Sequence, residues 1–217
     1  MSDATPVLAT RPPRVVLLAS AAGALIGIVL VFAMIRVSTD WPHILARTVP
    51  EDDYSERYVA HPWLAYLHIA PGVAYLLGAP LQLTRHFRTR HYTVHRWLGR
   101  ALLSFALVTG VLAMVFGLFF SWGGVLEASA SLIFGAWFVA CLVLAFRAIR
   151  RTDVSQHRRW MIRAFAVGVG VGTIRLWVGV FTALTIGRNG GPEGLTLPNQ
   201  FTLGVAFWLA FTMHVAL

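Results

Sequence analysis

The sequence predicts an all-α fold, an integral membrane helical bundle of six transmembrane helices with both ends of the chain in the cytoplasm (N-in/C-in). Three observations predict it. Of the 217 residues, 57% are hydrophobic and only 12% are charged, whereas about a quarter of a soluble domain is charged. The apolar residues gather in six long runs, and no run alternates apolar with polar residues as the strands of a membrane barrel do. The loops between the runs are alternately basic and not basic, which is the pattern that orients membrane helices.

The runs are placed by length and by the residues at their ends. A short polar segment, residues 1–14, comes first and is expected to be a cytoplasmic N-terminal segment. Residues 15–217 are then expected to form the six-helix transmembrane domain. About 20 apolar residues cross a bilayer core at 1.5 Å per residue, and Pro62 suits the first turn of a helix. The six runs lie at residues 15–35, 62–83, 98–120, 131–146, 160–186 and 201–217.

The loops set the orientation. Residues 83–100 hold five arginines, three histidines and no acid, and residues 147–163 hold six arginines against one aspartate. The loops at 36–61, 121–130 and 187–200 are acidic or nearly neutral. Because basic loops stay in the cytoplasm, we expect a plasma (inner) membrane protein whose partner is the lipid bilayer. Orientation explains the arginines, so no nucleic-acid partner is expected.

Two histidines suggest a cofactor. His95 begins the motif HRWLGR and His157 begins HRRWMIR, and each motif follows a basic loop and opens a run. If these two runs are neighbours, the imidazoles can face each other as the axial ligands of a haem b. His95 and His157 are therefore the predicted metal ligands, and His214 is a possible replacement for either. The alternative is that tryptophan and arginine at these positions only anchor the helices at the membrane surface.

A histidine and an arginine lie well inside predicted spans. His68 lies about two turns into the second span, as a neutral imidazole bonded to a hydroxyl or carbonyl, a haem ligand or a member of a proton relay. Arg175 lies roughly fifteen residues into the fifth span, where an arginine costs about 2.5–3.5 kcal/mol. The sequence places no acid inside any span. The expected partners of Arg175 are therefore backbone carbonyls, an aromatic face such as Trp177, a cofactor carboxylate, or water at the outer surface. Both residues are predicted to bind a cofactor.

Five motifs together resemble the domain-of-unknown-function 2306 family of bacterial multipass membrane proteins. They are HIAPG at 68–72, GAPLQ at 78–82, HRWLGR at 95–100, HRRWMIR at 157–163 and RLW at 175–177. The resemblance covers residues 62–217 and implies about six helices in a bacterial plasma membrane, while it leaves the activity open. The histidine motifs are also similar to those of ferric reductases and ascorbate-reducible b-type cytochromes, which bind two haems. Here only His68 lies within a span on the outer side, so a second pair of haem ligands is incomplete.

Three functions remain open at this point. The first is a b-type haem protein that transfers electrons, and the second is a non-catalytic membrane protein that assists assembly or binds a partner. The third is a small-molecule channel or transporter that uses Arg175 to bind anions. A dry bundle packed closely around Arg175 would count against the third function.

Overall fold

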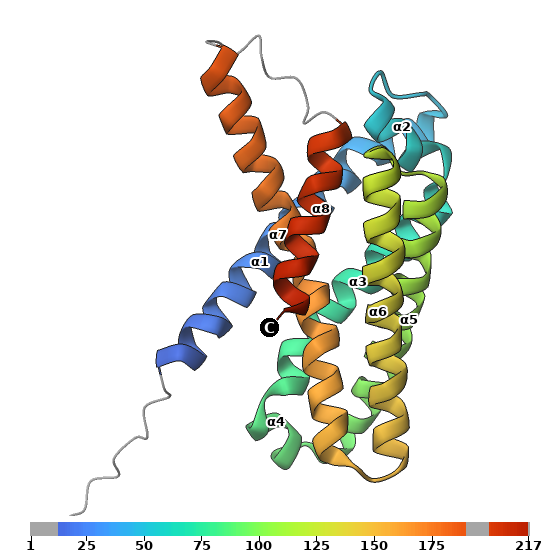
Figure 1. Ribbon diagram of the computed structural model, residues 1–217. Helices are drawn as coiled ribbons and strands as arrows, with labels where there is room; N and C mark the ends of the chain where they lie inside the picture. Colours follow the sequence, from blue (N-terminus) through green and yellow to red (C-terminus); the bar gives the residue numbers. More distant parts are fainter. Residues whose placement is uncertain (1–12, 190–199, 217) are drawn as a thin grey trace, which may run out of the picture.

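The computed structural model describes residues 13–189 and 200–216, with side chains at 14–184 and 200–216, and these residues are almost entirely helical (Figure 1). The helices, in chain order, are α1 (Pro13–Ala46), α2 (Asp53–Ala60), α3 (Pro62–Leu83), α4 (Arg85–Arg90), α5 (Tyr92–Phe119), α6 (Gly124–Arg150), α7 (Val154–Asn189) and α8 (Gln200–Val215). The described residues form no strand. The expected all-α fold is therefore confirmed.

Five helices are long and apolar enough to cross a membrane, namely α1, α3, α5, α6 and α7. The sixth predicted span corresponds to α8, which is apolar but has 16 residues and so measures about 24 Å. A bilayer core is about 30 Å thick. The protein is thus a multipass membrane protein, whereas the count of six crossings and the orientation remain predictions.

The loops of the structure are shorter than predicted, because helices continue through several charged stretches. The predicted loop at 36–61 is wrong in part, since α1 runs on to Ala46 and α2 forms within the same stretch. Arg36 pairs with Asp40 one turn later, which satisfies both charges inside the helix. The side chain of Asp52 caps α2 by accepting the N–H of Ser55 at 2.7 Å.

The second basic loop was also predicted too long. Only residues 151–153 separate α6 from α7, so most arginines of 147–163 lie on helix ends. In the first basic loop a short helix, α4, precedes α5. Residues 190–199 of the predicted loop at 187–200, and nearly all of the predicted N-terminal segment at 1–14, lie outside the described residues.

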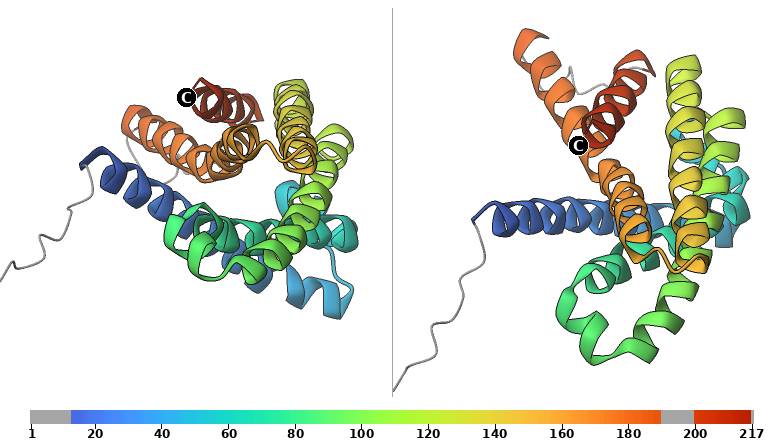
Figure 2. Two further views of the ribbon diagram at one scale, coloured as in Figure 1. Left: turned by 90° about the horizontal axis from the view of Figure 1, so that it is seen from below. Right: turned by 60° about the horizontal axis from the view of Figure 1, so that its bottom comes forward.

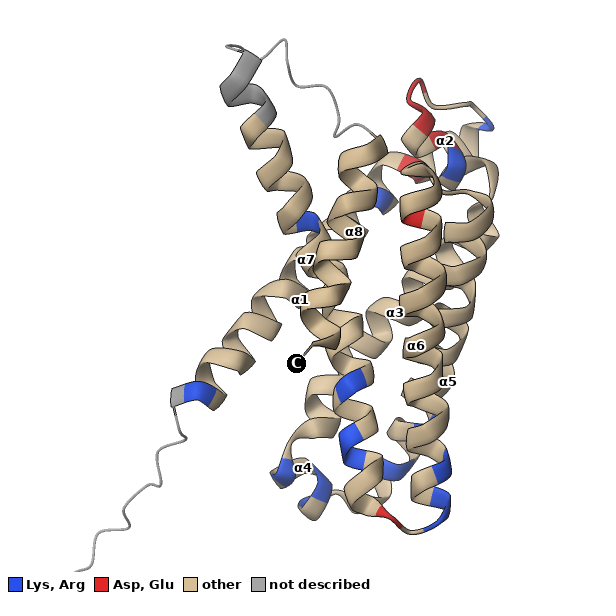
Figure 3. Ribbon diagram, in the orientation of Figure 1, with Lys and Arg blue, Asp and Glu red and all other residues tan. Residues whose placement is uncertain are grey.

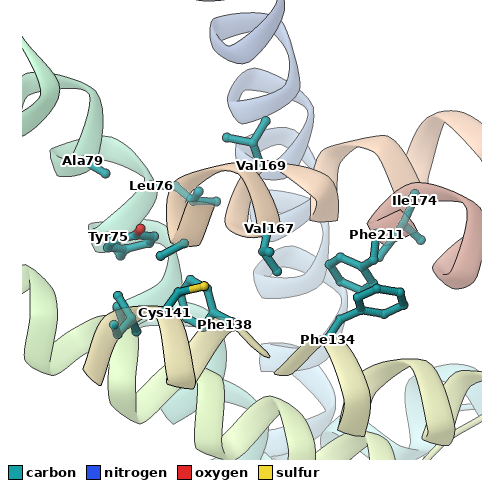
Figure 4. Packing of buried hydrophobic residues seen from close by; sticks show 14 of the residues in the cluster. Tyr75, Leu76, Ala79, Phe134, Phe138, Cys141, Val167, Val169, Ile174 and Phe211 are labelled. Atoms are coloured by element: carbon teal, nitrogen blue, oxygen red, sulfur yellow. The ribbon is translucent and has the colours of Figure 1, made fainter. Parts of the chain in front are cut away.

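The helices pack mainly against their neighbours in the chain, and α8 also packs against α6. Helix α1 instead crosses the bundle steeply and packs against α3 and α7 (Figure 2). A glycine permits this crossing, because a Cβ atom at Gly172 would lie 2.5 Å from the carbonyl oxygen of Leu25. The core lies between α3, α6, α7 and α8, with Tyr75, Phe138 and Phe211 among its largest side chains (Figure 4).

The two ends of the bundle differ in charge (Figure 3). One end is formed by α4, the start of α5, the turn between α6 and α7 and their adjoining ends, and it is rich in arginine. We call it the basic end. The opposite end carries α2 and both acidic and basic residues, and we call it the mixed-charge end. The separation follows the alternation of loops in the sequence.

Candidate functional site

A cavity of about 220 Å³ lies beneath α2 at the mixed-charge end. It is enclosed by residues of α1, α2, α3, α5, α6, α7 and α8, so it lies between the helices and not on the surface of the bundle. Most of its walls are apolar. Its charged lining residues are Arg36, Arg57, Glu127 and Arg175.

Arg36 is paired within α1. Its guanidinium donates to both carboxylate oxygens of Asp40, which is fully buried. The hydroxyl of Tyr66 donates to the same carboxylate at 3.0 Å. The guanidinium also lies 4.4 Å from the ring centre of Tyr58, within the range of a cation–π interaction. The positive charge of Arg36 is therefore compensated locally.

Arg57 is paired across the fold. Its Nη1 donates to Glu127 at 3.2 Å and to the carbonyl oxygen of Phe120 at 3.0 Å. The backbone N–H of Gly123 donates to the second oxygen of Glu127 at 2.5 Å. The two charged side chains are only 9% and 4% exposed. Arg57 thus fastens α2 to the turn between α5 and α6, yet its buried Nε has no partner among the described residues.

Arg175 has no such partner. It is partly buried, lies beside the hydroxyls of Tyr54 and Tyr58, and sits 5.1 Å above the ring centre of Phe32. No carboxylate among the described residues is within ion-pair distance of it. Three guanidinium groups thus meet two carboxylates, and one positive charge is left uncompensated.

One expectation about Arg175 is wrong, and another holds with a different residue. Acids do occur in helices long enough to span, because Asp40 lies in α1 and Glu127 in α6. The aromatic face beneath Arg175 belongs to Phe32, whereas Trp177 stacks on Phe181 at 5.8 Å. Residues two apart on a helix do not face the same way, so Arg175 and Trp177 meet different neighbours.

The pKa values of the two tyrosines of α2 shift in opposite directions. Burial raises the pKa of Tyr58. Burial acts in the same direction on Tyr54, but the guanidinium groups of Arg175 and Arg57 outweigh it, and the pKa of Tyr54 is lowered. A field that favours a phenolate also favours any other anion placed beside Arg175.

His68 lines the same cavity. Its Nδ1 lies 3.0 Å from the carbonyl oxygen of Thr109, and the hydroxyl of Thr109 donates to the carbonyl oxygen of His68 at 2.6 Å. A carbonyl only accepts, so Nδ1 carries the proton and Nε2 is the ring nitrogen left for a bound molecule. A bond from His68 to a carbonyl was one of the predicted alternatives. The structure also brings His68 and Arg175 to one cavity.

His95 and His157 lie at the other end, both near the start of their helices. His95 is close enough to His157 and Arg88 to interact with them electrostatically, and its buried Nδ1 has no partner among the described residues. His157 donates from Nδ1 to the carbonyl oxygen of Ala145 at 2.9 Å. Their helices, α5 and α7, do not pack against each other within the described ranges.

The predicted haem remains a prediction. No group of three or more histidine, cysteine, aspartate or glutamate residues in the described part of the chain is arranged to hold a metal ion, but a site with two histidines is a different arrangement. His214 lies elsewhere, with its Nε2 2.8 Å from the hydroxyl of Thr173.

The sequence did not single out several residues of the cavity. Tyr54, Arg57 and Tyr58 fell in a stretch expected to be a loop, although the cap at Asp52 is a recognisable helix start. Tyr75 lies in an apolar run where nothing distinguishes it from a core residue. Its hydroxyl is buried without a partner among the described residues, and its ring lines the cavity.

Of three comparisons with known proteins, one gives a match. Neither the curated proteins nor the solved structures contain a match to this chain. The profile of one family, DUF2306, described as a predicted membrane protein, matches residues 65–217. The match includes His68, Tyr75, Glu127 and Arg175 but begins after α1 and α2. It covers well over half of the chain, which therefore belongs to the DUF2306 family of predicted membrane proteins.

Proposed function

We propose that this protein is a carrier or transporter that binds a small anion in the cavity beneath α2. One observation carries the proposal: Arg175 lines this cavity without a carboxylate partner among the described residues, where three guanidinium groups meet two carboxylates. A charge held within a membrane bundle is costly and is usually functional. The cavity also means that the bundle is not packed solid around Arg175.

The groups around Arg175 suit an anion. A guanidinium is always charged and presents a planar fork that binds a carboxylate through two parallel hydrogen bonds. The hydroxyls of Tyr54 and Tyr58 lie beside it and supply further donors. Arg36 and Arg57 are already engaged by Asp40 and Glu127, so Arg175 is the group left for a ligand.

The proposed setting is a bacterial plasma (inner) membrane crossed six times, with both termini in the cytoplasm. The arginine-rich basic end supports this orientation, which places the cavity toward the outer face. Helix α8 is short for a crossing, and a modest local thinning of the bilayer accommodates such a helix.

Binding tests the function. The purified protein in lipid nanodiscs is titrated with acetate and with octanoate by calorimetry. Arg175→Gln is expected to weaken binding about 10- to 100-fold, because a hydrogen bond to a charged group contributes about 1.5–3 kcal/mol. Arg163→Gln, an exposed position on the same helix, should bind as the natural protein does. Equal affinity in the two variants would overturn the proposal.

Labelling tests the orientation. Glu51→Cys and Thr89→Cys place a thiol in exposed positions near opposite ends of the bundle, while the natural Cys141 is buried. A maleimide that cannot cross membranes should label intact cells only at position 51. Labelling only at position 89 would reverse the topology.

One observation favours a second candidate, a b-type haem held by His95 and His157. The bond from Nδ1 of His157 to Ala145 leaves Nε2 free, which is the arrangement that orients a metal-binding histidine. A haem would supply one-electron chemistry. A reduced protein with b-type absorption bands that disappear in His157→Ala would support it, and a spectrum without such bands would eliminate it. The partner-binding hypothesis stays a prediction without an observation of its own.

A further inference from the structure

The cavity has two polar ends. The distance between them can be estimated from the residue separations along α3 and α7. His68 and Tyr75 are seven residues apart on α3, and Gly168 and Arg175 are seven residues apart on α7. At 1.5 Å per residue each separation is about 10 Å. Helices α3 and α7 run in opposite directions (Figure 1), so if Tyr75 lies level with Gly168, then His68 and Arg175 also lie near one level.

The other two residues also share a level. A Cβ atom at Gly168 would lie 3.3 Å from Cε1 of Tyr75, so the tyrosine ring rests against α7 at that point. Figure 4 shows Tyr75 with its hydroxyl in the core beside Phe138 and Leu76. The backbone positions of Arg175 and Tyr75 therefore differ by about 10 Å along the bundle, and both residues line the cavity.

The wall between these two levels is apolar. It is formed by residues such as Gly72 and Val73 on α3 and Val171 on α7. A wall of this kind excludes a strongly hydrated ion from the middle of the cavity and favours hydrocarbon, each buried methylene raising affinity about fourfold.

Each end also holds a buried donor with no partner among the described residues. At the charged end it is Nε of Arg57, whose side chain is 9% exposed. At the far end it is the hydroxyl of Tyr75, which is 2% exposed. Buried polar atoms almost always have partners in folded proteins, so two such atoms in one cavity indicate a missing ligand with acceptors at both ends.

We propose that the ligand is an amphipathic monoacid with a straight apolar body about 10 Å long and an oxygen at its far end. This inference rests on the proposed function. The acid group binds Arg175 and Nε of Arg57, and its single negative charge matches the one uncompensated positive charge. The far oxygen bonds to the hydroxyl of Tyr75. An extended carbon chain advances about 1.25 Å per bond, so a chain of about eight carbons spans the space.

A ligand series tests this directly. Acetate, octanoate and 8-hydroxyoctanoate are titrated calorimetrically against the protein in lipid nanodiscs, with Arg175→Gln in the same nanodiscs to subtract partitioning into lipid. Octanoate is expected to bind at least tenfold more tightly than acetate, and the terminal hydroxyl is expected to add a further severalfold gain. Tyr75→Phe should abolish only the second gain, while Tyr92→Phe, an exposed tyrosine at the basic end, should leave both.

The outcomes separate the two proposals. Equal affinity for acetate and octanoate, with both lost in Arg175→Gln, would overturn the amphipathic ligand and leave the anion site in place. A hydroxyl gain that survives in Tyr75→Phe would overturn the assignment of the far end. Binding of every acid that is unaffected by Arg175→Gln would overturn both proposals.

Discussion

The two ends of the bundle use the same residue in opposite ways. At the basic end nearly all the arginines are exposed, and Asp153 is the one acid nearby among the described residues. At the mixed-charge end Arg36, Arg57 and Arg175 are partly or largely buried among acids and tyrosines. An exposed guanidinium is solvated by water and headgroups and needs no specific partner. A buried one does, so burial and partnership, rather than number, identify the arginines that form a site.

The largest expected difference between the two ends is in the stability lost when an acidic residue is replaced. Glu127→Ala leaves the buried Arg57 without its ion-pair partner, which is expected to lower the free energy of unfolding by about 3–5 kcal/mol. Asp153→Asn at the basic end removes an exposed charge but keeps an oxygen that can accept the N–H of Gln156, so it should change stability by less than about 0.5 kcal/mol. Unfolding of both variants in mixed micelles measures this. Similar losses in the two variants would show that the ends are not distinct.

Removing the charge of Arg175 should stabilise the protein, whereas removing the partner of Arg57 should destabilise it. Because no carboxylate in the described structure compensates it, Arg175→Met is expected to raise the free energy of unfolding of the ligand-free protein by roughly 1–3 kcal/mol. Arg163→Met, which alters an exposed arginine, should have little effect. The same unfolding measurement decides. A marked loss of stability in Arg175→Met would mean that the guanidinium supports the fold rather than a ligand.

The smallest difference concerns hydroxyl groups on α5. Thr109→Val removes the bond to the carbonyl oxygen of His68 and is expected to lower the free energy of unfolding by about 1 kcal/mol. Ser104 bonds only within its own helix, to Arg100, and is exposed. Ser104→Ala should therefore be nearly neutral. If Thr109→Val is equally neutral, the contact does not hold α3 and α5 together.

Much of the fold could be predicted from the sequence, because hydropathy identifies helices by the residues that they expose to lipid. The second span was predicted at 62–83, where α3 lies. The prediction failed where charges were taken to end a helix. Arg36 and Asp40 neutralise each other within α1, so the helix continues through them.

The site was only partly predictable. His68 and Arg175 were singled out because an ionisable group inside a span is costly. Arg57 and Glu127 were not, since they are 70 residues apart and nothing local indicates that they meet. Tyr75 becomes informative only when its hydroxyl is found without a partner in the described structure. The haem predicted at His95 and His157 depends on a geometry that periodicity cannot supply.

The family match begins at residue 65, so the cavity is lined both by the matched part of the chain and by the part before it. Arg175 and Tyr75 belong to the matched part, whereas Arg36 and Arg57 precede it. Under the proposed function, α1 and α2 would therefore supply the polar surroundings of the bound acid group, while the matched helices supply Arg175 and the apolar walls.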